Sequence, residues 1–156
     1  MRDTILIRFA DTKDIPVLIQ LLMELIRLES DFDADPERMQ QGFRLLLSDP
    51  EARCVIVADA DGKVVGMCTG QLFPSSVEGG LVLLIEDFVV HESMRCRGIG
   101  KKLIQAVEKW GAGKGAKRFQ LFADRDKERA HKFYKQLGWS ESGLTYWFKH
   151  PEYPGG

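Results

Sequence analysis

The sequence is poor in the residues and runs that would point to disulfides, structural metals or a membrane. It has only three cysteines, Cys54, Cys68 and Cys96, which are odd in number and far apart. This spacing offers neither a disulfide framework nor a CxxC metal site, so we expect reduced, mostly packed thiols and no metal. No apolar run reaches the length of a membrane helix. Residues 1–14 place charges around a short apolar run, which indicates a first strand and no signal peptide.

The chain also lacks a strong net charge. Lysine and arginine number 22 and aspartate and glutamate 23, so the formal net charge is −1 and no global field indicates nucleic acid or an anionic membrane as a partner. Hydrophobic residues make up 44% and charged residues 29% of the sequence, which is typical of a globular protein. We expect a cytoplasmic protein with a single domain over residues 1–150 and a short flexible tail, 151–156.

Hydrophobic periodicity predicts a mixed α/β domain in which helices are layered on a sheet. Strands are expected at residues 4–9, 53–58, 63–73, 81–90, 118–123, at 139 and at 145–149. Helices are expected at residues 14–29, 35–47, 98–110 and 127–137. The order is β-α-α-β-β-β-α-β-α-β-β. Asp61-Gly62 predicts a hairpin turn, the glycines at 111, 113 and 115 are expected to end the third helix, and Gly138 is expected to cap the fourth.

The most informative stretch runs from Phe88 to Leu103, where a strand passes into a helix through a basic, glycine-containing turn. The strand ends in Phe88, Val89 and Val90, and the turn contains Arg95, Cys96, Arg97, Gly98, Ile99 and Gly100. Free backbone N–H groups and the helix dipole favour an anion, most often a phosphate, at such a helix start. The arginines would lie near the anion, and the glycines remove side chains where a phosphate approaches the backbone.

Common motifs for phosphate binding and for hydrolysis do not fit this chain. Gly100-Lys101-Lys102 lacks both the spacing and the hydroxyl of a P-loop, and Gly98-Ile99-Gly100 is followed by Leu103 where a dinucleotide fold needs glycine. The nucleophile elbow of serine hydrolases, Gly-x-Ser-x-Gly, is absent. We therefore expect the histidines at 91, 131 and 150 to be surface or packing residues.

The pattern that remains, Arg-x-x-Gly-x-Gly from Arg95 to Gly100, resembles the acyl-CoA-binding signature of the GNAT superfamily of N-acetyltransferases. Residues 130–139, AHKFYKQLGW, are similar to the second family signature, Ala-x-x-Phe-Tyr-x-x-x-Gly-Phe. The two signatures stand in the right order, about thirty residues apart, and are far more specific together than either alone. The resemblance covers nearly the whole chain. It implies a GNAT-like fold, a central mixed, mostly antiparallel sheet flanked by about four helices.

The resemblance also implies acetyl-CoA as cosubstrate and no metal. Its pantetheine arm would pair with the backbone of Phe88 to Val90 as an added strand does. Its pyrophosphate would sit on the N–H groups of residues 95–100, with charge added by Lys101. Many relatives carry an asparagine that contacts the pantetheine arm at the position where this chain has Lys127. We expect Lys127 or Arg129 to contact CoA phosphates instead.

Two carboxylates and one phenol are the candidate catalytic groups. An amine must be neutral to attack a thioester, and Glu86 and Asp87 lie within an otherwise apolar strand. Strand alternation predicts that they face opposite sides of the sheet, and we expect Glu86 to accept the proton and bind the amine, with Asp87 as second choice. The alternative is a carboxylate paired with an arginine or at a hydrated surface. The surrounding Leu-Ile-Glu-Asp-Phe-Val-Val is similar to diamine acetyltransferases. The resemblance implies that Tyr134 is the general acid. The alternative is that its ring packs in the core.

The leading hypothesis is an enzyme that acetylates a primary amine of a small molecule or peptide by direct attack. A module that binds CoA without turnover and a protein N-acetyltransferase are the alternatives. An acyl-cysteine at Cys96 is disfavoured, because the family transfers directly. The acidic residues Glu29, Asp31, Asp33 and Asp35 would border the acceptor pocket. A homodimer through the C-terminal strands is plausible for the family.

Overall fold

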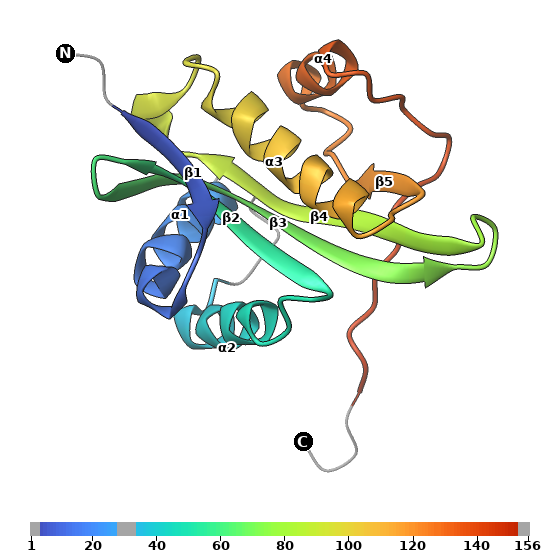
Figure 1. The fold of residues 1–156 in the computed structure, drawn as a ribbon, viewed down its shortest axis with the longest axis horizontal. Helices are drawn as coiled ribbons and strands as arrows, with labels where there is room; N and C mark the ends of the chain where they lie inside the picture. Colours follow the sequence, from blue (N-terminus) through green and yellow to red (C-terminus); the bar gives the residue numbers. More distant parts are fainter. Residues whose placement is uncertain (1–3, 28–33, 153–156) are drawn as a thin grey trace. The chain divides into compact units, whose positions relative to one another are not determined.

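The computed structural model describes residues 4–27 and 34–152 of the chain (Figure 1). Contacts divide the chain into two compact units, Met1–Leu121 and Phe122–Gly156. The first unit contains β1 (Ile5–Phe9), η1 (Thr12–Asp14), α1 (Ile15–Arg27), α2 (Pro36–Leu47), β2 (Arg53–Ala60), β3 (Lys63–Ser75), β4 (Gly80–Val90), η2 (Glu92–Met94), α3 (Ile99–Gly113) and β5 (Arg118–Leu121). The second unit contains α4 (Glu128–Gln136).

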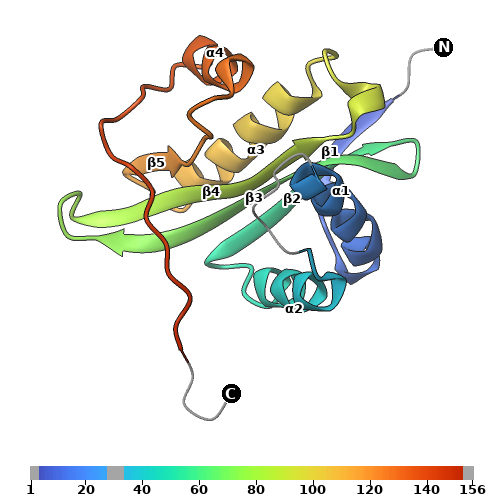
Figure 2. The same cartoon turned by 180° about the vertical axis from the view of Figure 1, so that it is seen from behind.

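The first unit is a three-layer arrangement around one sheet. The strands lie in the order β1-β2-β3-β4-β5, antiparallel from β1 to β4, while β5 runs parallel to β4. This confirms the predicted mixed, mostly antiparallel sheet. Helices α1 and α2 cover one face of the sheet and α3 covers the other (Figure 1, Figure 2). The two faces therefore bury separate sets of apolar side chains.

The α3 face of the sheet depends on glycines in β3. A Cβ atom on Gly70 would lie 2.8 Å from Val107 Cγ1 of α3, and one on Gly66 would lie 3.0 Å from Leu103 Cδ1. These glycines let the helix approach the strand closely. On the opposite face, Val55, Val57 and Met67 belong to the core formed with α1 and α2.

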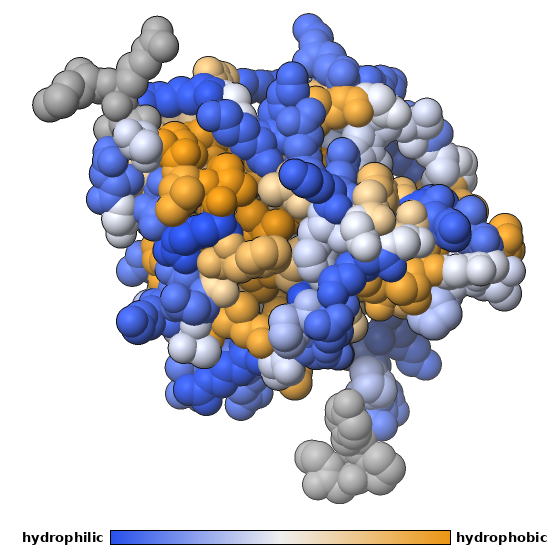
Figure 3. All heavy atoms as spheres, viewed as in Figure 1, coloured by the Kyte–Doolittle hydropathy of each residue, from blue (hydrophilic) through white to orange (hydrophobic). Residues whose placement is uncertain are grey.

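The edge strand β1 is tied to its neighbours by a guanidinium. Arg8 Nη1 lies 2.9 Å from Asp14 Oδ2, and its Nε lies 3.1 Å from Asp59 Oδ2 of β2. The hydrogen bond from Arg8 lowers the pKa of Asp14. The same strand exposes Leu6 and Phe9, and Figure 3 shows apolar side chains gathered over this part of the surface. The ion pairs of Arg8 therefore stabilise an edge strand that leaves two apolar side chains exposed.

Two turns that adjacent residues predict are present in the structure. Asp61 and Gly62 adopt φ angles of 51° and 92° between β2 and β3, as the expected hairpin turn requires. In the second unit, Gly138 has a φ of 90° and follows α4. The Trp139 N–H donates to the Tyr134 carbonyl oxygen at 3.0 Å, so the predicted glycine cap of α4 is confirmed.

The end of α3 differs from the prediction. The helix runs through Gly111 and Gly113 and ends at a glycine cap in which Gly115 has a φ of 88°. The Ala116 N–H donates to the Gly111 carbonyl oxygen across this cap at 3.0 Å. Gly111 lies inside the helix because a Cβ there would be 2.8 Å from Leu83 Cδ2. Close packing, and not chain termination, explains the glycine at 111.

The predicted strands at Trp139 and at 145–149 are wrong within the described part of the chain. Trp139 follows the α4 cap, and no strand is formed between Thr145 and Lys149. Tyr146 and Phe148, whose alternating positions favoured a strand, stack on each other with ring centroids 6.0 Å apart. A strand also needs a neighbouring backbone to pair with, and sequence alternation alone cannot supply one. The strand expected at 118–123 is likewise shorter and ends at Leu121.

The two glycines of α3 provide a matched test of this packing. Gly111→Ala should lower the free energy of unfolding by about 1–3 kcal/mol, because the new methyl group overpacks against Leu83. Gly113→Ala meets no atom within 4 Å and should raise that free energy by up to about 1 kcal/mol through helix propensity. Urea unfolding of both variants measures the difference. Equal shifts of the same sign would show that α3 does not pack against β4 as described.

Candidate active site

The centre of β4 carries a bulge. Between the pairing positions Ile85 and Phe88, β4 has two residues, Glu86 and Asp87, whereas the facing segment of β3 has only Thr69. An extra residue in one strand shifts the alternation of side chains by one position. Even-numbered side chains before the bulge therefore lie on the same side of the sheet as odd-numbered side chains after it.

The bulge brings both carboxylates to the same side of the sheet. Glu86 lies on the same side of the sheet as Leu84, whose partner across the ladder is Gln71. Asp87 lies on the same side as Val89, which belongs to the core under α1 and α2. Both carboxylate residues line one pocket. The prediction that they face opposite sides of the sheet is therefore wrong, because it assumed a regular strand.

This pocket has a volume of about 430 Å³ and lies between the sheet and the helices α1 and α2. Its helix side is lined by Leu22, Met39, Gly42, Phe43, Leu45 and Leu46, and its sheet side by Arg53, Gln71, Glu86 and Asp87. One wall is therefore largely apolar and the other carries charge. Such a combination is typical of sites that bind small organic molecules.

Asp87 sits in a constrained and poorly hydrated position. Its backbone N–H donates to Thr69 Oγ1 at 3.0 Å, and the Thr69 hydroxyl donates to Asp87 Oδ2 at 3.4 Å. Burial, and to a lesser extent the negative charge of Glu86, raise the pKa of Asp87 to about 6, and the Thr69 hydrogen bond opposes this rise.

The raised pKa has a cost in stability. An unfolded aspartate ionises near its ordinary pKa of 3.8, whereas folded Asp87 holds its proton until about pH 6. Ionisation of Asp87 therefore destabilises the fold progressively as the pH rises through that interval. A carboxylate kept at such a cost inside a pocket is typical of a functional site.

Glu86 is the more accessible of the two carboxylates. Its side chain is exposed at the pocket, and Oε2 accepts a hydrogen bond from Gln71 Nε2 at 3.2 Å. Gln71 thus orients Glu86 from the neighbouring strand. The two acids differ in environment, which separates their chemical properties despite their adjacency.

The ladder between β4 and β5 ends next to the bulge. Their parallel ladder runs from the pair Val82–Arg118 to the pair Ile85–Leu121, where β5 ends. β4 continues to Val90 and so extends beyond its parallel neighbour. An extended ligand chain can add to a strand at such a point. The predicted pantetheine-binding residues, Phe88 to Val90, occupy this stretch.

The predicted phosphate turn has a backbone geometry that is suited to an anion. Cys96 and Gly98 have φ angles of 63° and 79°, and Gly98 is the N-cap of α3, which no side chain caps. Left-handed residues turn successive N–H groups toward one side. This conformation costs a non-glycine residue such as Cys96 about 1 kcal/mol or more. Strain at this turn therefore points to a function for its shape.

The side chains of the turn divide into anchoring and exposed groups. Ile99 is buried and fixes the first turn of α3 to the core, so only its backbone can meet a ligand. Arg97 and Lys101 are exposed. Arg95 Nε donates to the Val90 carbonyl oxygen at 3.0 Å, which joins the turn to the end of β4. The structure thus brings the predicted strand and turn residues together in one unit.

The second unit carries the other predicted site residues. Tyr134 lies on α4, with its ring centroid 5.4 Å from that of Phe133 and 6.2 Å from that of Trp139. Lys127 is the N-cap of the same helix. No residue of α4 is fully buried, so Phe133 and Tyr134 are only partly packed.

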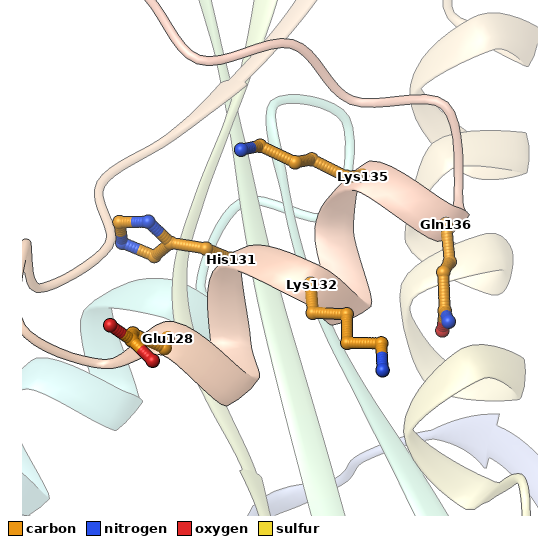
Figure 4. Close-up of a pocket in the computed structure, with 5 residues that line it drawn as sticks. All are labelled: Glu128, His131, Lys132, Lys135 and Gln136. Carbon is orange, nitrogen blue, oxygen red and sulfur yellow. The ribbon is translucent and has the colours of Figure 1, made fainter.

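A further pocket, of about 560 Å³, lies on α4. It is lined by Glu128, His131, Lys132, Lys135 and Gln136. Figure 4 shows that all five side chains come from one helix, with His131 and Lys135 pointing one way and Lys132 and Gln136 another. A site with convergent groups usually draws them from several elements. The pocket beside Glu86 and Asp87 is therefore the better candidate.

The remaining candidate residues have simpler roles. Cys54 and Cys68 are buried as predicted, and burial raises the pKa of the Cys54 thiol to about 12 and that of Cys68 as well. Cys96 is exposed in the turn. None of the three histidines is buried. Glu29, Asp31 and Asp33 lie outside the described residues, whereas Asp35 caps α2 by accepting from the Glu37 N–H at 2.9 Å.

Three residues of the site were not recognised in the sequence. Arg53 and Gln71 line the pocket, and Thr69 holds Asp87. Each is an ordinary polar residue within a β run, and only the pairing of β2, β3 and β4 places them beside the carboxylates. No spacing or motif marks them in advance.

The described residues contain neither a metal cluster nor a membrane helix. Within residues 4–27 and 34–152, no three His, Cys, Asp or Glu side chains are grouped so that they could hold a metal ion. No helix in this part of the chain combines the length and apolar character needed to cross a membrane.

Two known proteins with similar sequences are N-acetyltransferases. An aminoalkylphosphonate N-acetyltransferase of Salmonella typhimurium is 29% identical over 140 residues, 90% of this chain and 88% of that protein. An aminoglycoside N(6')-acetyltransferase of the same organism is 27% identical over 118 residues, 74% of this chain and 80% of that protein.

A solved structure and a family model agree with these relatives. An aminoglycoside N-acetyltransferase in complex with CoA has a TM-score of 0.81 at 20% identity, covering 96% of this chain and 97% of its own, and so shares the fold. The model of the Acetyltransferase (GNAT) family matches residues 19–139. The chain therefore belongs to the GNAT family, whose members transfer an acetyl group from acetyl-CoA to an amine.

Proposed function

We propose that this protein acetylates the primary amine of a small molecule that binds beside Glu86 and Asp87. The observation that carries the proposal is the β4 bulge, which sets two carboxylates in one pocket where β4 extends beyond β5. An acylated chain laid along the end of β4 would meet an amine held in this pocket. The named relatives, which act on an aminoglycoside and an aminoalkylphosphonate, support a small-molecule acceptor.

Acetyl-CoA is proposed to bind to the first unit. The end of β4, Phe88 to Val90, would pair with the pantetheine arm, and the N–H groups of residues 95–100 would bind the pyrophosphate. The uncapped N-terminus of α3 and the left-handed Cys96 and Gly98 support this role. Exposed Arg97 and Lys101 would add positive charge, and Lys127 is proposed to contact a CoA phosphate.

The carboxylates are proposed to divide the work on the amine. Acetyl-CoA supplies a thioester, which only a neutral amine attacks. Asp87 has a pKa of about 6, so it is ionised at neutral pH and is a stronger base than an ordinary aspartate. We assign proton acceptance to Asp87 and binding of the ammonium group to exposed Glu86. This reverses the preference drawn from the sequence, because that preference did not include burial.

Tyr134 is proposed as the general acid. As the carbon–sulfur bond of the thioester breaks, the Tyr134 hydroxyl would donate its proton to the departing sulfur. The second proton lost by the attacking nitrogen would restore the Tyr134 hydroxyl through water, and the proton taken up by Asp87 returns to solvent. The position of Tyr134 within the Phe-Tyr signature on α4 supports this role. A module that binds CoA without turnover is not favoured, because the named relatives are enzymes. A cytoplasmic location and a homodimer remain predictions.

Replacing the carboxylates tests their division of work. The wild-type kcat/KM should rise with pH through an apparent pKa near 6, because below that pH Asp87 is protonated and cannot accept a proton. Asp87→Asn should lower kcat by about 10²–10⁴-fold and remove this limb of the profile. Glu86→Gln should mainly raise KM for the amine. Initial rates of thiol release at several pH values measure all three quantities.

The two variants also control for each other. Both remove one negative charge from the same pocket, so a simple electrostatic effect would be shared. If Glu86→Gln abolishes the limb near pH 6 and Asp87→Asn retains it, the two roles are reversed. If both variants turn over like the wild type, neither carboxylate takes part in the reaction.

Removal of a single hydroxyl tests Tyr134. Tyr134→Phe should lower kcat by about 10²-fold or more with little change in KM, because protonation of the departing sulfur is lost while binding is kept. Tyr146→Phe, an exposed tyrosine of the same unit, is the matched control and should turn over normally. Stopped-flow detection of the free thiol gives kcat for both. An unchanged kcat in Tyr134→Phe would remove the phenol from the mechanism.

A further inference from the structure

We propose that the acceptor is a short primary amine that carries an anionic group at its other end, and that Arg53 recognises this anion. The proposal rests on the function proposed above and specifies its substrate class. Arg53 lines the same pocket as Glu86 and Asp87, but nothing in acetyl transfer itself calls for a guanidinium on the amine side. Its presence there needs a separate explanation.

Strand pairing and one side-chain hydrogen bond place the opposite charges in an oblique row across three strands. Arg53 of β2 is the partner of Gln71 of β3, and the Gln71 side chain donates at 3.2 Å to Glu86, which lies two residues along β4 from the partner of Gln71. With strands about 4.8 Å apart and a rise of about 3.3 Å per residue, the backbones of Arg53 and Glu86 are separated by roughly 12 Å. The row runs from a cation through a neutral amide to an anion. A ligand that lies across it meets charges of opposite sign at its two ends.

The guanidinium is held in place and keeps donors for a ligand. Arg53 Nη1 donates to the Leu45 carbonyl oxygen at the end of α2, at 3.0 Å. Among the described residues, Arg53 forms no ion pair with a carboxylate within 4 Å. The planar fork of an arginine presents five donors and suits the paired oxygens of a carboxylate, phosphate or phosphonate. The contact to Leu45 uses one of these donors and orients the rest.

The other wall of the pocket suits a short hydrocarbon chain between the two charges. Leu22, Met39 and Phe43 contribute apolar surface opposite the charged row. The volume of about 430 Å³ is in the lower part of the range for small-molecule sites, roughly 300–1,000 Å³. A diamine of similar length would place its second ammonium group near Arg53, where like charges repel. The pocket therefore favours a zwitterionic amine over a polyamine.

A matched substrate panel tests this specificity. For each of several chain lengths, kcat/KM is measured with an aminoalkylphosphonate, an amino acid whose amine and carboxylate are at opposite ends, a diamine and a plain alkylamine. The wild type should prefer an anion-bearing amine over the diamine and the alkylamine of equal length by about tenfold or more. The phosphonate and carboxylate arms show which anion is preferred. A preference for diamines or plain alkylamines overturns the proposal.

Substitution of Arg53 links this preference to the guanidinium. Arg53→Gln should reduce the ratio of kcat/KM between the anionic amine and the alkylamine by about tenfold or more, and Arg53→Lys should restore it only in part. Arg44→Gln, an exposed arginine of α2 outside the pocket, is the matched control and should leave the ratio unchanged. Retention of the wild-type ratio in folded Arg53→Gln contradicts the proposal.

A measurement on the wild type alone guards against a variant that fails to fold. An alkylphosphonate without an amine should inhibit competitively against the acceptor, and an absence of inhibition counts against the anion site. Failure of the proposed function is distinguishable from both results, because the protein would then release no thiol with any amine of the panel. In that case the substrate class falls together with the function.

Discussion

The site depends on one irregular pairing, in which Thr69 of β3 faces both Glu86 and Asp87 of β4. Thr69 is fully buried, and its hydroxyl accepts from the backbone N–H of Asp87. That hydrogen bond satisfies a donor which the interrupted ladder leaves without its regular partner. In a regular strand, one of the two carboxylates would point into the core under α3. The bulge therefore explains how adjacent acids share a pocket and how they come to differ in pKa.

The rest of the first unit supports this arrangement from both faces of the sheet. On the α3 face, Gly66 and Gly70 allow close packing of the helix that begins at the phosphate turn. On the other face, α1 and α2 enclose the pocket. β4 links the two parts of the site, since its middle carries the carboxylates and its C-terminal end leads through η2 into the turn at Gly98. A single strand thus relates the amine pocket to the proposed acetyl-CoA site.

Local features of the fold could be predicted from the sequence, and features set by pairing could not. A few adjacent residues determine the strand–turn–helix at residues 88–103, the hairpin turn at Gly62 and the cap at Gly138, and the structure has these elements where expected. The bulge is a one-residue shift in register and has no residue signature of its own, so the relative directions of Glu86 and Asp87 were predicted wrongly. The role of Gly111 is predicted wrongly for a related reason, because close contact with Leu83 on another element requires the glycine. The strand predicted at 145–149 needed a pairing partner that periodicity cannot show.

The central claim is that the reacting amine is held beside the β4 bulge while acetyl-CoA lies along the end of β4. A crystal structure with a bisubstrate analogue, in which the amine nitrogen is joined through an acetyl linker to CoA, tests it most directly. The account predicts that this nitrogen lies within hydrogen-bond reach of Asp87, directly or through one water, and that the pyrophosphate lies on the N–H groups of residues 95–100. A nitrogen bound away from the pocket of Glu86 and Asp87 would contradict it.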